Sequence, residues 1–208
     1  MKRVYLVRHG ESEGNVSGTV GGKDLVLTDT GHMQAAQLAE RVEHLDIDML
    51  VCSDFVRAQQ TIAPAATAKK LEPTILPEVG EILEPSSLFG VLETDERVQT
   101  YRHGRNTHIE DPDWRFEDGE NYADVQTRIN AAKAYLENVE SENILVVSHA
   151  FYICLFSASI LLNRDYPSQE TFDIAVCLEM SNTGISYMTF HEEQWRLVVH
   201  NDHAHFAE

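Results

Sequence analysis

Two histidines and two arginines stand near the ends of apolar segments in this chain of 208 residues. Arg8 and His9 directly follow the first such segment. Arg57 comes a few residues after the second, and His149 ends the third. A guanidinium group binds two phosphate oxygens at once, and a neutral imidazole can act as a nucleophile. Together these residue types favour a site that binds phosphate and could transfer it.

Two motifs of other catalytic and phosphate-binding sites are absent from the sequence: it has no HExxH and no GxxxxGK[ST] segment. His9 is therefore the candidate nucleophile, and the other three residues would offset charge on the phosphoryl oxygens. An acid must also protonate the leaving oxygen and later deprotonate a water molecule. The candidates for this acid are Glu78, Glu81 and Glu84.

Three short apolar runs rich in β-forming residues predict buried strands. They cover residues 3–7, 48–52 and 143–148, and each is followed by candidate site residues. Ligands of open α/β sheets bind outside the carboxyl ends of the strands. We therefore expect the two histidines and two arginines to converge at one edge of a sheet.

Helical spacing of apolar residues predicts helices between these strands. Thr28, Asp29 and Thr30 are candidate N-caps for the first helix, and Ser53 or Asp54 for the second. The alternating segments 184–190 and 194–200 predict a terminal hairpin, and residues 74–76 predict a short extended piece. The expected helices span 31–45, about 54–71, 120–140 and 150–162. Strands that alternate with helices imply a layered α/β domain with a mostly parallel sheet.

Residues 85–118 do not fit this alternation, and we interpret them as an insertion that forms a small cap or lid, with a short helix near 91–103. Within it, residues 97–108 contain five arginines and histidines: Arg97, Arg102, His103, Arg105 and His108. A solvated helix face is the default interpretation. The alternative is a lid whose cations bind a second anionic group on the substrate.

Length and charge limit the classes of function. The length predicts a single domain over 1–208. With 16 Lys and Arg against 34 Asp and Glu, the formal charge is −18, which argues against nucleic acid and against anionic membrane surfaces. A small anionic ligand in a locally basic pocket remains compatible with this charge.

Cysteine usage and apolar runs predict the cellular compartment. We expect Cys52, Cys154 and Cys177 to be buried thiols in a reducing compartment. Every apolar run is too short for a signal peptide or a membrane span, so we expect a cytoplasmic protein without a membrane partner. The tail histidines at 200, 203 and 205 have no nearby cysteine, and we expect no metal site there.

Five segments, in order along the chain, resemble the motifs of the histidine phosphatase superfamily, in its phosphoglycerate mutase-like branch. They are RHGES at 8–12 followed by Asn15, LTDTGHMQA at 27–35, SDFVRAQQT at 53–61, GEN at 119–121 and VVSHA at 146–150. Two positions depart from the family pattern: Asn121 replaces a serine, and Ala150 replaces a glycine.

The resemblance implies a three-layer α/β/α sandwich with a mostly parallel sheet, and a phosphohistidine mechanism without metal or cofactor. It implies that His9 is the nucleophile and that Arg8, Arg57 and His149 form the phosphate pocket, with Asn15 and Thr28 at positions that often border it. The family's proton donor is a glutamate after the third extended segment. Position favours Glu81, with Glu84 in reserve.

These observations favour a phosphatase that hydrolyses a small phosphomonoester. The family's mutases carry an ERHYG segment that this chain lacks, which argues against a mutase. Two alternatives stay open, a phosphoglycerate mutase and a non-catalytic module that binds a phosphorylated ligand. The sequence names no substrate, and it leaves open whether the chain acts as a monomer or a homodimer.

Overall fold

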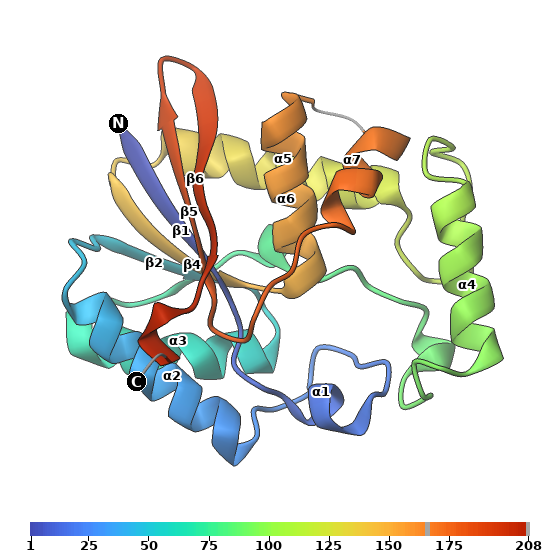
Figure 1. Cartoon of the computed structure of the whole chain (residues 1–208), viewed down its shortest axis with the longest axis horizontal. Coiled ribbons are helices and arrows are strands. Elements are labelled where there is room, and N and C mark those ends of the chain that lie inside the picture. Colours follow the sequence, from blue (N-terminus) through green and yellow to red (C-terminus); the bar gives the residue numbers. More distant parts are fainter. Residues whose placement is uncertain (165–166, 207–208) are drawn as a thin grey trace.

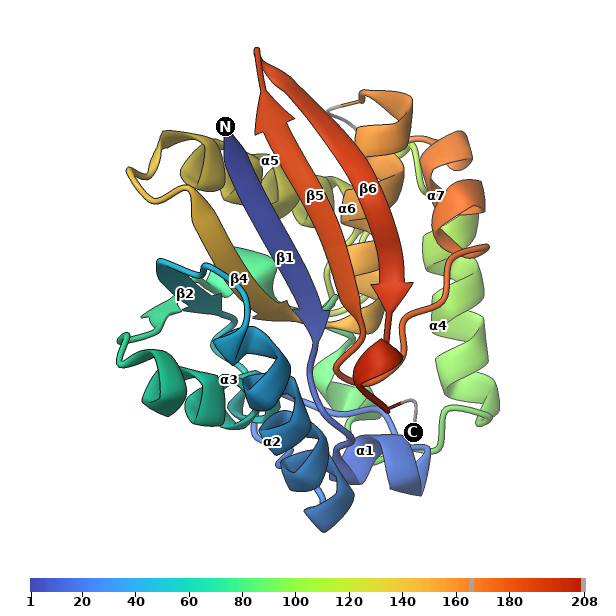
Figure 2. The same cartoon turned by 60° about the vertical axis from the view of Figure 1, so that its left-hand side comes forward.

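A six-stranded sheet forms the middle layer of the computed structural model, which describes residues 1–164 and 167–206. The strand order is β3-β2-β4-β1-β5-β6. The first four strands in this order are parallel, and β5 and β6 run antiparallel to their neighbours (Figure 2). The strands are β1 (Lys2–Arg8), β2 (Met49–Cys52), β3 (Thr74–Ile75), β4 (Asn143–Ser148), β5 (Ile185–His191) and β6 (Gln194–Asp202).

Helices cover both faces of the sheet (Figure 1). On one face, α2 (Asp29–Glu43) and α3 (Val56–Lys69) pack against inward side chains such as Val7 and Val147. On the other face, α5 (Tyr122–Asn138) and α6 (Ala150–Leu162) pack against Val4, Leu6 and Val146. Successive strand residues point to opposite faces, so each parallel strand is apolar on both sides. The expected three-layer sandwich is confirmed.

Several helix boundaries differ from the prediction. Helix α3 has Phe55 as its N-cap, so the prediction of Ser53 or Asp54 was wrong. The Ser53 side chain instead contacts His149. The cap helix α4 (Glu96–Thr107) begins later than expected, because the side chain of Asp95 accepts a hydrogen bond from the N–H of Arg97 and caps it.

Short elements were not predicted, because they are too short to show apolar periodicity. They are α1 (Glu13–Ser17), α7 (Gln169–Ala175) and the 3₁₀ turns η1 (Pro77–Val79), η2 (Ser86–Leu88) and η3 (Ala204–Phe206). The predicted hairpin is present. Its turn places Glu192 and Glu193 at φ of 52° and 58°, the left-handed backbone that a tight two-residue hairpin requires.

Residues 85–118, called the cap from here on, contain η2 and α4. Helix α4 stands apart from the sheet, beyond α7 and α1 (Figure 1). The cap has its own small apolar cluster, in which Leu88, Val98 and Tyr101 pack with Val20. This cluster is separate from the two cores beside the sheet. The interpretation of the cap as an insertion within one domain stays a prediction.

The cysteine prediction was wrong at one position. Cys52 and Cys154 are buried, but Cys177 is exposed. Helix α7 buries Ala175 and ends there, so the next residues turn toward solvent. Within residues 1–164 and 167–206, no helix combines the length and the apolar character needed to cross a bilayer.

Candidate active site

The carboxyl ends of β1, β2 and β4 meet at one edge of the sheet. Arg8 lies opposite Ser148, and Cys52 lies opposite Val147. This register places the residues that directly follow the strands side by side, as expected from the sequence. Helix α3 follows β2 closely enough to bring Arg57 to the same edge, so the four candidate residues converge.

His9 is held in one orientation and one tautomer. Its Nδ1 lies 2.6 Å from the carbonyl oxygen of Gly10, and a carbonyl can only accept, so Nδ1 carries the proton. The lone pair therefore resides on Nε2, which accepts a hydrogen bond of 3.2 Å from Nε of Arg57. Burial, with the charges of Arg57 and Arg8, lowers the His9 pKa well below its usual value. The ring is neutral at pH 7, with an unprotonated Nε2.

His149 is buried next to His9, with ring centroids 5.1 Å apart. Its Nε2 lies 2.8 Å from Oγ of Ser53, and that oxygen accepts a hydrogen bond from the N–H of Phe55. The serine proton is thus free to donate to Nε2, which leaves the imidazole proton on Nδ1. This Nδ1 is buried and has no hydrogen-bond partner among the described residues. Burial and Arg57 lower the His149 pKa well below its usual value.

The two arginines provide the positive charge of the site. Arg57 is buried against the ring of Phe55 and donates to the carbonyl of Gly22 at 3.0 Å. Burial lowers its pKa to about 10. Arg8 donates to the carbonyl of Met180, and its Nε is buried without a partner in the described part of the chain. Neither guanidinium forms an ion pair with a described carboxylate, so an anion from outside would be favourable here.

Glu81 and Glu84 have different surroundings. The Oε1 atom of Glu81 accepts hydrogen bonds of 3.0 Å from the N–H groups of Ile82 and Tyr152, and Oε2 accepts one of 3.1 Å from Phe151. The carboxylate therefore caps the N-terminus of α6, directly after His149. Glu84 is instead paired with Arg102 of the cap at 2.7 Å.

Asn15 and Thr28 were both expected at the border of the site. Asn15 lines the pocket. Thr28 lies outside the pocket lining and acts as the N-cap of α2, where its Oγ1 accepts from the N–H of Gly31. Sequence reasoning missed Asn182, whose amide donates to the carbonyl of His9 at 3.0 Å. Asn182 belongs to none of the recognised motifs, so no local signal identified it.

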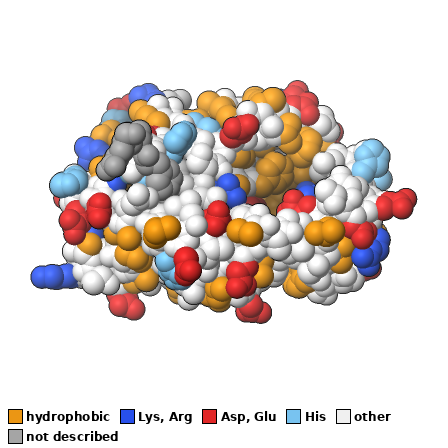
Figure 3. Space-filling model, turned by 60° about the horizontal axis from the view of Figure 1, so that its bottom comes forward, with side chains coloured by type: hydrophobic (Ala, Val, Ile, Leu, Met, Phe, Trp, Pro, Cys, Tyr) orange, Lys and Arg blue, Asp and Glu red, His pale blue; other side chains and the backbone are white. Residues whose placement is uncertain are grey.

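A pocket of about 430 Å³ opens over Arg8, His9 and Arg57. His149, which is buried beside His9, is not part of its lining. The floor of the pocket includes Arg8, His9, Arg57 and Glu81, and its far side includes residues of the cap and of α6 and α7. Figure 3 shows a hollow with hydrophobic side chains in its wall and with basic and acidic side chains at its margin. The pocket lining therefore combines charged side chains with apolar side chains.

The three tail histidines contact different residues. His200 contacts Glu179 and Ser186, His203 contacts Asn201, and His205 contacts Arg41 and Thr183. Across residues 1–164 and 167–206, no group of three or more His, Cys, Asp or Glu side chains is arranged to hold a metal ion.

Comparison with known proteins places the chain in a family. Residues 4–203 match the model of the histidine phosphatase superfamily, branch 1. A probable phosphoglycerate mutase, GpmB, from Enterobacter sp. (strain 638) is 32% identical over 201 residues, which cover 94% of this chain and 88% of that protein.

Solved structures share the fold at lower identity. Bacillus stearothermophilus YhfR aligns with a TM-score of 0.82 at 23% identity, covering 99% of both chains. A putative alpha-ribazole-5'-P phosphatase from Escherichia coli aligns with a TM-score of 0.79 at 23% identity, covering 97% of this chain and 96% of that one.

Proposed function

The chain belongs to the histidine phosphatase superfamily, and from its pocket we propose that it is a phosphatase that hydrolyses a small phosphomonoester through a phosphohistidine at His9. The proposal depends most on the contact between Nδ1 of His9 and the carbonyl of Gly10. That contact leaves an unprotonated Nε2 in a positively charged site, where no carboxylate among the described residues forms an ion pair with Arg8 or Arg57. A neutral imidazole held in this way is suited to attack phosphorus.

In the first step, Nε2 of His9 forms a bond to phosphorus while the bond from phosphorus to the ester oxygen breaks. The N–H of Arg57 that now contacts Nε2 would turn to a phosphoryl oxygen. The unpartnered Nε of Arg8 and Nδ1 of His149 supply further donors for the charge on these oxygens. Protein groups meet this charge, so the scheme assigns no step to a metal or cofactor.

Glu81 would protonate the leaving oxygen. Its Oε1 already accepts two hydrogen bonds, whereas Oε2 accepts one and keeps a lone pair for a proton. In the second step, the resulting carboxylate takes a proton from water, the water oxygen bonds to phosphorus, and the bond between phosphorus and Nε2 breaks. Phosphate leaves and Glu81 is protonated again.

A phosphoglycerate mutase is the second candidate, because the curated relative at 32% identity has that name. A mutase would return the phosphoryl group to the sugar acid rather than to water, after priming by a bisphosphate. The absence of the ERHYG segment favours hydrolysis.

The test compares the wild type with His9→Ala on p-nitrophenyl phosphate and on a panel of phosphomonoesters. We expect the variant to lose about a thousandfold or more of kcat, and the wild type to yield an acid-labile phosphohistidine by mass spectrometry. The control is His32→Ala, an exposed histidine on α2, which should keep full activity. EDTA should not change the rate.

Full activity in His9→Ala would refute the proposed mechanism. Interconversion of 2- and 3-phosphoglycerate without phosphate release, in the presence of 2,3-bisphosphoglycerate, would replace the phosphatase proposal by the mutase.

A further inference from the structure

The basic residues of the cap divide into two groups. Arg97, His103 and His108 are exposed, as a solvated helix face would be. Arg102 and Arg105 instead line the same pocket as His9. The default expectation therefore holds for three of the five residues and fails for the two that face the reaction centre.

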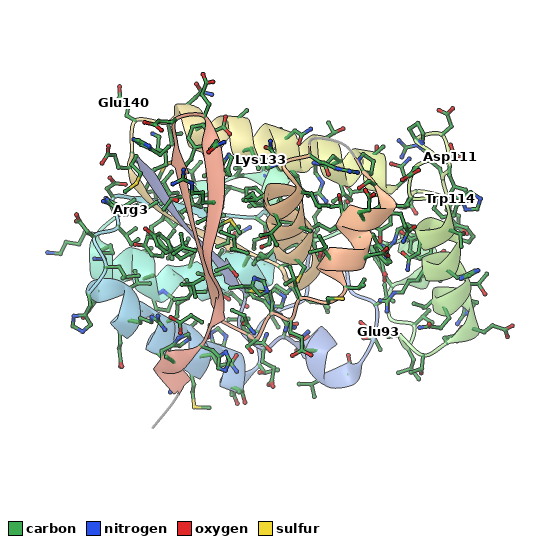
Figure 4. All side chains as sticks on the ribbon, turned by 45° about the horizontal axis from the view of Figure 1, so that its top comes forward. Arg3, Glu93, Asp111, Trp114, Lys133 and Glu140 are labelled. Atoms are coloured by element: carbon green, nitrogen blue, oxygen red, sulfur yellow. The ribbon has the colours of Figure 1, made fainter. Side chains whose placement is uncertain are left out.

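Arg102 is neutralised by acidic partners nearby. Its Nε and Nη2 contact the two carboxylate oxygens of Glu84 at 2.7 and 3.2 Å, and its Nη1 contacts Glu93 at 3.5 Å. Figure 4 labels Glu93 at the end of the cap that faces α1. Arg102 thus needs no anion from a ligand.

Arg105 lies one turn further along α4 and lacks such a partner. It is 6% exposed, and its guanidinium packs over the rings of Tyr101 and Tyr122, each at 5.3 Å. Its hydrogen-bonding partners are the hydroxyls of these two neutral tyrosines. No carboxylate of the described residues forms an ion pair with it, and its Nε is buried without a hydrogen-bond partner. A guanidinium in this state has lost water without gaining a counter-ion.

Asn106 adds a second donor beside Arg105. Its Oδ1 accepts a hydrogen bond of 3.0 Å from the hydroxyl of Tyr122, and its amide nitrogen has no recorded partner in the described residues. Asn106 and Arg105 both line the pocket, together with apolar side chains such as Phe151 and Phe172. A guanidinium without a carboxylate partner, an amide donor and an apolar wall suit a carbon skeleton that ends in an anion.

We propose that Arg105, assisted by Asn106, binds a second anionic group of the substrate while Arg8 and Arg57 bind the phosphoryl group. The preferred substrates are then small phosphomonoesters that also carry a carboxylate or a second phosphate. This inference rests on the proposed phosphatase function.

The test uses matched substrates that differ only in the distal group. Phosphorylated ω-hydroxy acids of two to six carbons are compared with alkyl phosphates and with alkanediol bisphosphates of the same lengths. We expect kcat/KM to be about tenfold to a hundredfold higher for an anionic member than for its alkyl counterpart at the best length, as for one charged hydrogen-bonded pair. The carboxylate and bisphosphate series identify which anion is preferred.

Variants then locate the effect. In Arg105→Gln the ratio of kcat/KM between the anionic and alkyl members should fall toward one, and Arg105→Lys should keep part of it because the charge remains. Arg97→Gln, an exposed arginine on the same helix, is the control and should retain the wild-type ratio. Binding of the same compounds to His9→Ala, measured by calorimetry, should show the same preference without turnover.

Two outcomes would overturn the inference. One is a wild type that hydrolyses all three series equally well, which needs no variant to fold. The other is an Arg105→Gln variant that is folded and keeps the full preference. Failure to hydrolyse any phosphomonoester would instead refute the proposed function, which is a separate result.

Discussion

The floor of the pocket and the cap use charge in different ways. On the floor, Arg8 and Arg57 have no acidic ion-pair partner in the described chain, and the two histidines are buried and neutral. In the cap, acidic and basic side chains pair with each other, as Arg97 does with Asp95 and Arg102 with Glu93, and Arg102 also pairs with Glu84 just before the cap. An arginine without a carboxylate partner therefore indicates where an anionic ligand is expected. Arg105 is an arginine of the cap that, like Arg8 and Arg57 on the floor, has no such partner among the described residues.

The two regions also differ in how they are positioned. The floor lies at the ends of β1, β2 and β4, and the backbone hydrogen bonds between these strands fix their ends relative to one another. The cap depends on α4, its Asp95 N-cap and the small cluster around Val98. Changes in the cap can therefore alter which substrate enters without displacing the groups that carry out the chemistry.

The largest expected difference in kcat is between variants of Glu81, on the floor, and of Glu84, which is paired with Arg102 of the cap. Glu81→Gln removes the proposed proton donor, so kcat on alkyl phosphates should fall about a hundredfold or more. The loss should be smaller on p-nitrophenyl phosphate, whose leaving group needs little protonation. Glu84→Gln should lower kcat far less. Equal losses, or a larger loss in Glu84→Gln, would exchange the two roles.

A smaller loss of kcat is expected from a change at Ser53, because its hydroxyl contacts His149. Ser53→Ala removes the donor that fixes the tautomer, and kcat should fall about tenfold, as for one lost hydrogen bond. The ¹⁵N shifts of His149 should also show a loss of the single Nδ1–H form. Ser157→Ala, a buried serine on α6 whose hydroxyl lacks a described partner, is the matched control. An unchanged His149 spectrum would contradict the proposal.

The smallest effect is a pH dependence of stability that belongs to the floor. His9 and His149 have lowered pKa values when folded, so below pH 6.5 the unfolded chain takes up protons that the folded chain does not. This stability is present above pH 6.5 and is lost as the pH falls, by up to about 1.4 kcal/mol per pH unit for each histidine. Urea unfolding at pH 7.5, 6.5 and 5.5 measures it.

His149→Ala should have a shallower slope than the wild type, because it lacks one of the two buried rings. His103→Ala removes an exposed histidine of the cap and should keep the wild-type slope. If all three proteins share one slope, the buried histidines do not govern acid stability.

Some of this molecule could be predicted from local pattern. The three apolar runs end within one residue of β1, β2 and β4, and the residues after them meet because parallel strands present their carboxyl ends at the same edge. The hairpin and the long helices follow from periodicity of two and of about 3.6. The short helices α1 and α7 were not predicted, because they span too few turns to show a periodic pattern of apolar residues.

The amino-acid sequence by itself determined the strands and the long helices, since these depend on spacing along one segment. It also predicted that His9, Arg57 and His149 converge, because each follows a strand whose carboxyl end lies at the same edge of the sheet. Only the tertiary structure decided that the backbone of α6 holds Glu81, that Ser53 sets the tautomer of His149, and that Arg102 is paired while Arg105 is not. Burial and pairing depend on groups far apart in the chain, and these meet only when the chain folds.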